Sequence, residues 1–242
     1  MTTPILSSEK REGNGAVPAP EEPSPARIEA FSDGVFSIIT TLLVLDLRVP
    51  REAMLRGQPL LSALADQWPL YVAFAVSFLQ VGVVWANHHT MFHHIKKSDH
   101  VLLGLNLLLL MCIAVLPFTT ALLSEYARSN LPDLRVAAFI YSAVLGVAGI
   151  FFVLIWRHAD RRGLIQPHTD EHRIAALGLH WMFVPLFYGV AFLLVFVNPY
   201  LGMSVYLLLL FYYALPGPIF IRWMTRHRTR RAALTLRRRS MR

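Results

Sequence analysis

Long apolar stretches alternate with short polar segments along most of this chain. Six stretches approach or exceed the roughly 20 helical residues that cross a bilayer's hydrocarbon core. They lie at about residues 27–47, 68–92, 100–123, 134–156, 173–197 and 201–221. A segment in lipid must satisfy its own backbone hydrogen bonds, so the pattern predicts helices. We therefore expect an all-α integral membrane protein with six transmembrane helices in one domain, residues 27–223.

Prolines interrupt several of these stretches. A proline within a helix removes a backbone donor and clashes with the preceding turn, so it bends or ends the helix. We expect such bends or ends at Pro117, Pro185, Pro216 and Pro218.

The charged residues gather between and beyond the apolar stretches, and they predict an orientation. Of 242 residues, 55% are hydrophobic and only 16% are charged, which argues against a soluble domain. Basic residues concentrate in loops 93–99 and 157–172 and in the tail from Arg222, which holds nine arginines. With six spans, these segments share one side with the N-terminus, and the positive-inside rule makes that side cytoplasmic. We expect a multi-pass protein of the cell membrane with both termini in the cytoplasm.

The two ends of the chain differ in composition. Residues 1–26 are rich in Pro, Glu, Ser and Gly, which is typical of a disordered tail. Residues 224–242 form a basic tail that we interpret as a topology anchor in contact with anionic lipid headgroups. The net charge of +8 also suits nucleic acid, but topology explains it better. We therefore expect membrane lipids, and no nucleic acid, as partners.

The first apolar stretch carries polar groups near its start. Arg27, Glu29, Ser32 and Asp33 precede a remainder composed mainly of Ile, Leu, Val and Thr. Asp33 lies about 9 Å along a helix from Arg27, at a depth where an unpaired carboxylate is costly. Residues six apart on a helix do not face each other, so their partners should come from other helices. We predict that Arg27, Ser32 and Asp33, together with His89 of the second stretch, are buried in a hydrogen-bonded network.

Four histidines lie at the C-terminal end of the second stretch, where they could form a metal site. They are His88, His89, His93 and His94. Histidine boxes bind iron, zinc or copper, but the chain has no second dense box. His88 and His89 both lie at the membrane level of Asp33, and either of them can hydrogen-bond to Asp33 or Ser32. The sequence favours this structural network over a metal, with Asn106 as a further member that joins helices.

Several of these residues follow the spacing of a known family. Arg27-x-x-x-Phe31-Ser32-Asp33 opens the first stretch, Trp85-x-x-x-His89-x-x-Phe92 ends the second, and Asn106 and Pro117-Phe118 follow in the third. Over about residues 27–125 this pattern resembles the transmembrane protein 175 family of potassium channels, in its prokaryotic six-span branch. The resemblance implies a structural polar network of Arg27, Phe31, Ser32, Asp33, Trp85, His89 and Asn106.

The same resemblance implies a homotetramer whose first helices line a central pore. The apolar constriction of that family falls here on Ile38, Leu42 and Leu45, with Thr41 as a polar layer. The i, i+4, i+7 spacing independently places the three apolar residues on one helical face. Four copies would form stacked apolar rings that can gate by dewetting. On spacing alone, ordinary helix packing explains the stripe better.

The sequence thus predicts a homotetrameric, potassium-permeable channel that conducts passively, with no cofactor, no resident metal and no enzymatic activity. Its expected partners are potassium ions, membrane lipids and further copies of the chain. Two rival functions are a proton-coupled secondary transporter, using Asp33 and His89, and a histidine-box membrane metalloenzyme. The first stretch lacks the break that many transporter helices show, and the missing second histidine box disfavours the enzyme.

Overall fold

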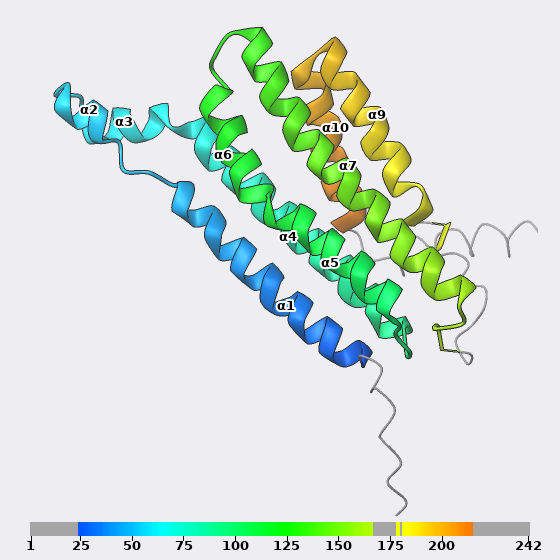
Figure 1. Ribbon diagram of the computed structural model, residues 1–242. Coiled ribbons are helices and arrows are strands. Elements are labelled where there is room, and N and C mark those ends of the chain that lie inside the picture. The colour runs from blue at the N-terminus through cyan, green and yellow to red at the C-terminus, as the bar shows by residue number, and fades with distance from the viewer. Residues whose placement is uncertain (1–23, 167–177, 180, 215–242) are drawn as a thin grey trace, which may run out of the picture.

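Helices make up almost all of the computed structural model, which describes residues 24–166, 178–179 and 181–214 (Figure 1). In chain order they are α1 (Pro25–Leu42), the 3-10 helix η1 (Leu43–Asp46), α2 (Arg51–Leu55), α3 (Leu60–Asp66), α4 (Trp68–His94), α5 (His100–Ala114), α6 (Leu116–Tyr126), α7 (Leu131–Arg161), α9 (Val184–Val197) and α10 (Pro199–Ala214). Among the described residues, β-pairing is limited to one antiparallel bridge between Ile95 and Ile165. The all-helical prediction is confirmed for this part of the chain.

Four helical segments in the described ranges are long and apolar enough to cross a membrane. They are Pro25–Asp46, Trp68–His94, His100–Tyr126 and Leu131–Arg161, which correspond to the first four predicted spans. The apolar helices α9 and α10 are shorter, with 14 and 16 residues. The predicted spans 173–197 and 201–221 both extend beyond the described residues. The count of six spans therefore stays a prediction.

Two of the predicted proline breaks are confirmed. Helix α5 ends at Ala114, and α6 begins at Leu116 with Pro117 in its first turn. Likewise, α9 begins at Val184 with Pro185 in its first turn. Proline is tolerated there because the first amides of a helix have no intrahelical acceptor. Pro216 and Pro218 lie outside the described residues.

The start of α1 corrects one predicted boundary. The side chain of Ser24 caps the helix by accepting a hydrogen bond from the backbone amide of Arg27. Residues 25 and 26, which the composition assigned to a disordered tail, are therefore helical. A serine cap followed by proline favours a helix start here, despite the polar composition upstream. Residues 1–23 lie outside the described part, as do residues 224–242 of the basic tail.

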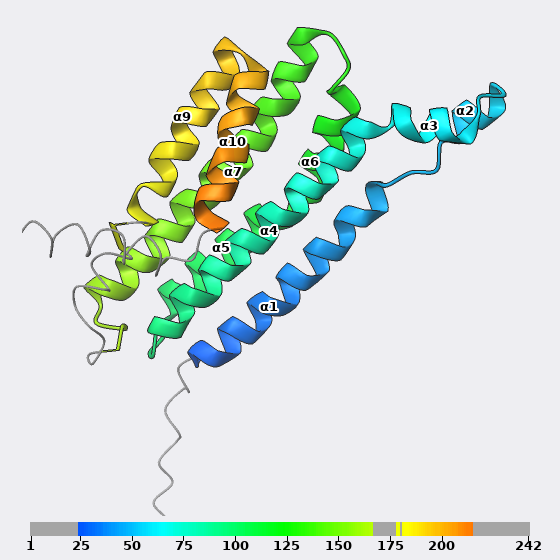
Figure 2. The ribbon, with the colours of Figure 1, turned by 180° about the vertical axis from the view of Figure 1, so that it is seen from behind.

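Helix α1 forms one edge of the bundle. Figures 1 and 2 both show it running along α4 and α5, with α9 and α10 on the far side of the bundle. Helix α7 lies between these groups, packing against α5 and α6 as well as α9 and α10. Helices α4 and α7 thus have neighbours on more than one side, whereas α1 packs against α4, α5 and α6 on one face only.

The segment between α4 and α5 is hydrogen-bonded to the end of α7 and to the residues that follow it. Asp99 caps α5 by accepting a hydrogen bond of 2.8 Å from the backbone amide of Leu102. Its other carboxylate oxygen lies 2.8 Å from Nε2 of His158 on α7. The β-bridge and main-chain hydrogen bonds also join residues 94–97 to residues 164–166. The two basic loops therefore meet at one end of the bundle.

The surroundings of Asp99 favour its ionised form. Burial opposes ionisation, but the hydrogen bonds from Leu102 and His158 and the charges of His158 and Arg162 together outweigh it. The pKa of Asp99 is consequently lowered from its ordinary value of 3.8. A lowered pKa in the folded state contributes stability that is complete above 3.8 and is lost as the pH falls through the lowered value.

Removing this carboxylate should loosen the junction. We expect Asp99→Ala to destabilise the purified protein by about 1–3 kcal/mol, because both the helix cap and the bond to His158 disappear. Asp99→Asn retains a cap acceptor and should lose less. The melting temperature in detergent at neutral pH measures both variants. A wild-type melting temperature for Asp99→Ala would contradict the proposed junction.

Candidate functional site

Helix α1 has a buried face and an uncovered face. Its inward residues recur every three or four positions and are at most 4% exposed: Ile28, Ser32, Phe36, Ile39 and, in η1, Leu43. They pack against α4 and α5. On the opposite face, Ile38 is 59% exposed and Leu45 is 71% exposed in the single chain. A large apolar surface at this depth needs lipid or another protein chain to cover it.

The predicted pore residues all lie on this uncovered face. Ile38, Leu42 and Leu45 are exposed, as is Thr41 between them. The α-helix ends at Leu42, so Leu45 belongs to the tighter η1 turn. In a 3-10 helix residues three apart eclipse one another, which keeps Leu45 in line with Leu42. The hydroxyl of Thr41 donates a 2.8 Å hydrogen bond to the carbonyl of Ile38, leaving its oxygen lone pairs unused by that bond.

A buried chain of hydrogen bonds fixes the opposite face of α1. Asn106 of α5 donates from Nδ2 to Oγ of Ser32 at 2.9 Å, and its Oδ1 lies 2.8 Å from Nε2 of His88 on α4. All three side chains have 0% exposure. Because Oδ1 of Asn106 can only accept, Nε2 of His88 carries the proton. This chain of hydrogen bonds therefore joins three helices through side chains that lipid and water do not reach.

Two further pairs connect α1 to α4 beside this chain. Nε1 of Trp85 donates to Oδ1 of Asp33 at 2.9 Å, and Nδ1 of His89 lies 2.8 Å from Oε1 of Glu29. Glu29 and Asp33 are four residues apart on α1, as are Trp85 and His89 on α4. Such i, i+4 spacing puts each set on one helical face, so the two pairs meet along a single interface.

The geometry differs from the predicted network in several respects. Ser32, Asp33, Trp85 and Asn106 make bonds between helices, and the partner of Asp33 comes from another helix as expected. The histidine bonded to Asn106 is His88, however, whereas His89 pairs with Glu29. No partner was predicted for Glu29, although its i, i+4 spacing to Asp33 was a usable signal.

Arg27 and Phe31 do not join these bonds among the described residues. Both side chains are exposed, Phe31 at 55%, and the side chain of His89 is 57% exposed in the single chain. The expectation of burial is therefore not met for Arg27 and His89 within one subunit, and Asp33 is only half-buried. Arg27 and Phe31 lie on the uncovered face of α1, because their spacing from Ile38 follows the helical repeat of that face rather than that of Ser32.

The histidines of α4 have separate surroundings. The ring of His88 stacks on Phe92 at 4.4 Å between centroids and meets the edge of Phe36, while His93 and His94 contact each other. Within the described part of the chain, no three His, Cys, Asp or Glu side chains converge closely enough to hold a metal ion. What the geometry shows at His88 is a hydrogen bond between helices.

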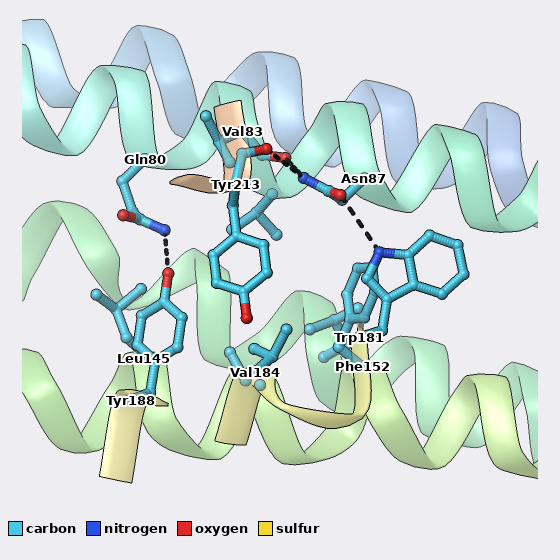
Figure 3. Close-up of a pocket in the computed structure, with 13 residues that line it drawn as sticks. Gln80, Val83, Asn87, Leu145, Phe152, Trp181, Val184, Tyr188 and Tyr213 are labelled. Carbon is cyan, nitrogen blue, oxygen red and sulfur yellow. Dashed lines mark hydrogen bonds between the residues drawn. The ribbon is translucent and has the colours of Figure 1, made fainter. Parts of the chain in front are cut away.

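A second polar group, which the sequence analysis missed, joins α4 to the C-terminal helices (Figure 3). Nε2 of Gln80 donates to Oη of Tyr188 at 2.8 Å, and Nε1 of Trp181 donates to Oδ1 of Asn87 at 3.3 Å. Asn87 also donates to the backbone carbonyl of Tyr213. These residues line a cavity of about 40 Å³ on the side of α4 that faces away from α1. The seven-residue spacing of Gln80 and Asn87, two helical turns, was the available signal.

Known proteins with similar sequences identify the family. A potassium channel of Chamaesiphon minutus is 42% identical over 202 residues, which cover 82% of this chain and 98% of that protein. The chain belongs to the TMEM175 family. The sequence profile of that family, described as endosomal/lysosomal potassium channel TMEM175, matches residues 27–117, from α1 into α6.

Further TMEM175 relatives agree in sequence and in structure. A potassium channel of Streptomyces collinus is 41% identical over 188 residues, covering 77% of this chain and 90% of that protein. The crystal structure of a lysosomal potassium-selective channel TMEM175 homolog from Chamaesiphon minutus superimposes with a TM-score of 0.72 at 40% identity. The match covers 80% of this chain and 97% of that chain. The fold described above is therefore a TMEM175 fold.

The buried hydrogen bonds of Ser32, Asn106 and His88 predict how strongly different substitutions lower the stability of the protein. Asn106→Leu should cost about 1–3 kcal/mol, because His88 loses its hydrogen bond at a fully buried position. Ser32→Ala removes the bond from Asn106 and the bond that Ser32 donates to the carbonyl of Ile28, but it leaves the bond between Asn106 and His88 and should cost less. Adding His88→Phe to Asn106→Leu keeps a ring against Phe92 and removes the orphaned nitrogen.

Thermal unfolding in detergent tests this order, with oligomeric size as a second readout. The double variant should be more stable than Asn106→Leu alone, since replacing both partners by apolar groups removes the unpaired polar atom. A double variant less stable than Asn106→Leu would show that the bond between Asn106 and His88 does not dominate this site.

Proposed function

We propose that this chain is the subunit of a homotetrameric potassium channel, and that four copies of α1 line its central pore. The observation that carries the proposal is the uncovered face of α1, where Ile38 is 59% exposed in a single chain. A lone chain would present this face to lipid, but four chains around one axis would bury it. The potassium channels of Chamaesiphon minutus and Streptomyces collinus, close in sequence, support the same function.

Ile38 would form the narrowest ring of this pore. Isoleucine is β-branched and has one strongly preferred rotamer in a helix, so four copies give a well-defined apolar constriction. A potassium ion finds no oxygen at such a ring and crosses only with accompanying water or when the ring widens. Leu42 and Leu45 would continue the narrow path. Thr41 offers the nearest oxygen ligands, because its proton is already donated to a backbone carbonyl.

The polar bonds behind α1 would hold the pore face in position. The Ser32–Asn106–His88 chain and the pair between Asp33 and Trp85 attach α1 to α4 and α5. In lipid, such bonds and close packing replace the hydrophobic effect that joins helices in water. We assign these residues a structural role, because they lie behind the conducting face.

The topology that we propose has six spans and both termini in the cytoplasm, with α9 and α10 within the last two spans. It is supported by the meeting of residues 94–97 and 164–166, which brings both basic loops to one membrane side. That side would be the cytoplasmic face of the cell membrane. Conduction would be passive and would require no cofactor, since the span Pro25–Asp46 is helical throughout, as α1 followed directly by η1, and offers no midpoint break to a coupling ion.

A polar ring at Ile38 should open the constriction. We expect Ile38→Asn to raise potassium flux into liposomes and to weaken discrimination against sodium, because an asparagine ring stays wetted and admits hydrated ions. Ile38→Ala should act in the same direction by widening the ring. Purified variants in liposomes with a potassium or a sodium gradient provide the measurement.

A matched control separates pore effects from general effects of polarity. Leu208 is 67% exposed and belongs to α10, a helix on the opposite side of the bundle from α1 (Figure 1), so Leu208→Asn should leave flux and selectivity unchanged. A stable Ile38→Asn tetramer with wild-type flux and selectivity would place the barrier elsewhere. Loss of selectivity in Leu208→Asn as well would exclude a specific role for Ile38.

A further inference from the structure

A cavity of about 290 Å³ lies between α4, α6, α7 and α10, separate from the uncovered face of α1. Its walls are mostly aliphatic, with Ala73 and Val76 from α4, Leu134 and Ala138 from α7, and Met203 and Leu207 from α10. None of its lining residues belongs to α1. It occupies the end of the bundle opposite Asp99, because α4 and α7 both begin there.

The polar atoms in the cavity wall are largely engaged with one another. Ser77 accepts a 2.8 Å hydrogen bond from Thr120 and lies 3.3 Å from Oη of Tyr141. Ser204 donates to the backbone carbonyl of Tyr200. A water molecule needs two to four polar partners, and an apolar cavity of about 150 Å³ already stays dry and takes up an apolar ligand. The larger cavity here therefore suits an apolar occupant better than water.

The mouth of the cavity has the character of a membrane interface. Trp68 and Tyr200 line it and are 54% and 56% exposed, and such aromatic residues are enriched at the level of lipid headgroups. Val72 is 50% exposed and Leu207 is 40% exposed, and both also line the cavity. The cavity is thus continuous with apolar surface that the bilayer covers.

The same end of α7 carries a cationic side chain next to the lining residues in sequence. Arg135 directly follows the lining residue Leu134, and its Nε is buried with no hydrogen-bond partner among the described residues. The phosphate of a phospholipid headgroup is an acceptor of complementary charge. We propose that one acyl chain of a membrane phospholipid occupies this cavity, with its headgroup at the rim formed by Trp68 and Tyr200.

Photolabelling in membranes tests this proposal. The protein is reconstituted into phosphatidylcholine–phosphatidylglycerol vesicles that contain a phospholipid with a diazirine in one acyl chain, and labelled residues are mapped by mass spectrometry. Labels should concentrate on lining residues of α4, α7 and α10. Ala73→Phe places a ring in the cavity and should reduce that labelling roughly tenfold, because overpacking excludes the chain.

Ala75→Phe is the matched control, since Ala75 is exposed on α4 and does not line the cavity. The Ala75→Phe protein should be labelled at the same residues and to the same extent as the wild type. Both variants should retain the wild-type oligomeric size and potassium flux. Labels spread evenly over exposed residues of α9 and α10 would overturn the proposal. So would labelling of the cavity that Ala73→Phe leaves unchanged, or a cavity that stays unlabelled because a neighbouring subunit or water occupies it.

Discussion

Polar side chains buried between helices determine where α1 lies, and the rest of the structure depends on that placement. Lipid tails are as apolar as leucine, so burial of apolar surface contributes little to the association of one transmembrane helix with another. The hydrogen bonds from Ser32 through Asn106 to His88 do favour association, because each of these polar atoms would otherwise be unpaired in a medium without water. They also select one face of α1 for the interior of the subunit, which leaves the face with Ile38 uncovered.

Helix α4 carries polar contacts in two directions. Trp85, His88 and His89 bind α1 and α5, whereas Gln80 and Asn87 bind the C-terminal helices. The helix thereby connects the proposed pore helix to α9 and α10, which make no direct contribution to the bonds around α1. Two cavities accompany this arrangement, a small one beside Asn87 and a larger one near the other end of the helix. Both lie away from the uncovered face, so the proposed conduction path and the proposed lipid site use different surfaces.

Much of this arrangement followed from sequence, because lipid imposes strict requirements on length and polarity. The first four spans, the breaks at Pro117 and Pro185 and the need of Asp33 for a partner on another helix could all be predicted. The choice between His88 and His89 could not. Adjacent residues point about 100° apart on a helix, and α4 has polar residues on several faces, so its rotation is not evident from its pattern.

Other features depended on distances that a linear pattern does not contain. The pairing of Glu29 with His89 requires the relative height of α1 and α4, and the exposure of Arg27 follows from the rotation of α1. The cavity beside Ala73 arises from the combined shapes of side chains on four helices, and the sequence of any single helix does not predict it. The last two spans extend past the described residues, so their length still rests on the apolar pattern.

Block of potassium flux by cadmium ions at single cysteines would test the assignment of the α1 face most directly. Cys112 is the single native cysteine, so a Cys112→Ser background permits Ile38→Cys and Ile39→Cys to be compared at adjacent positions. Four thiolates can converge on one soft metal ion only around a shared axis. Strong block of Ile38→Cys with none of Ile39→Cys, which is 2% exposed within its own subunit, is the predicted result. Block of Ile39→Cys alone would contradict the placement of Ile38 in the pore.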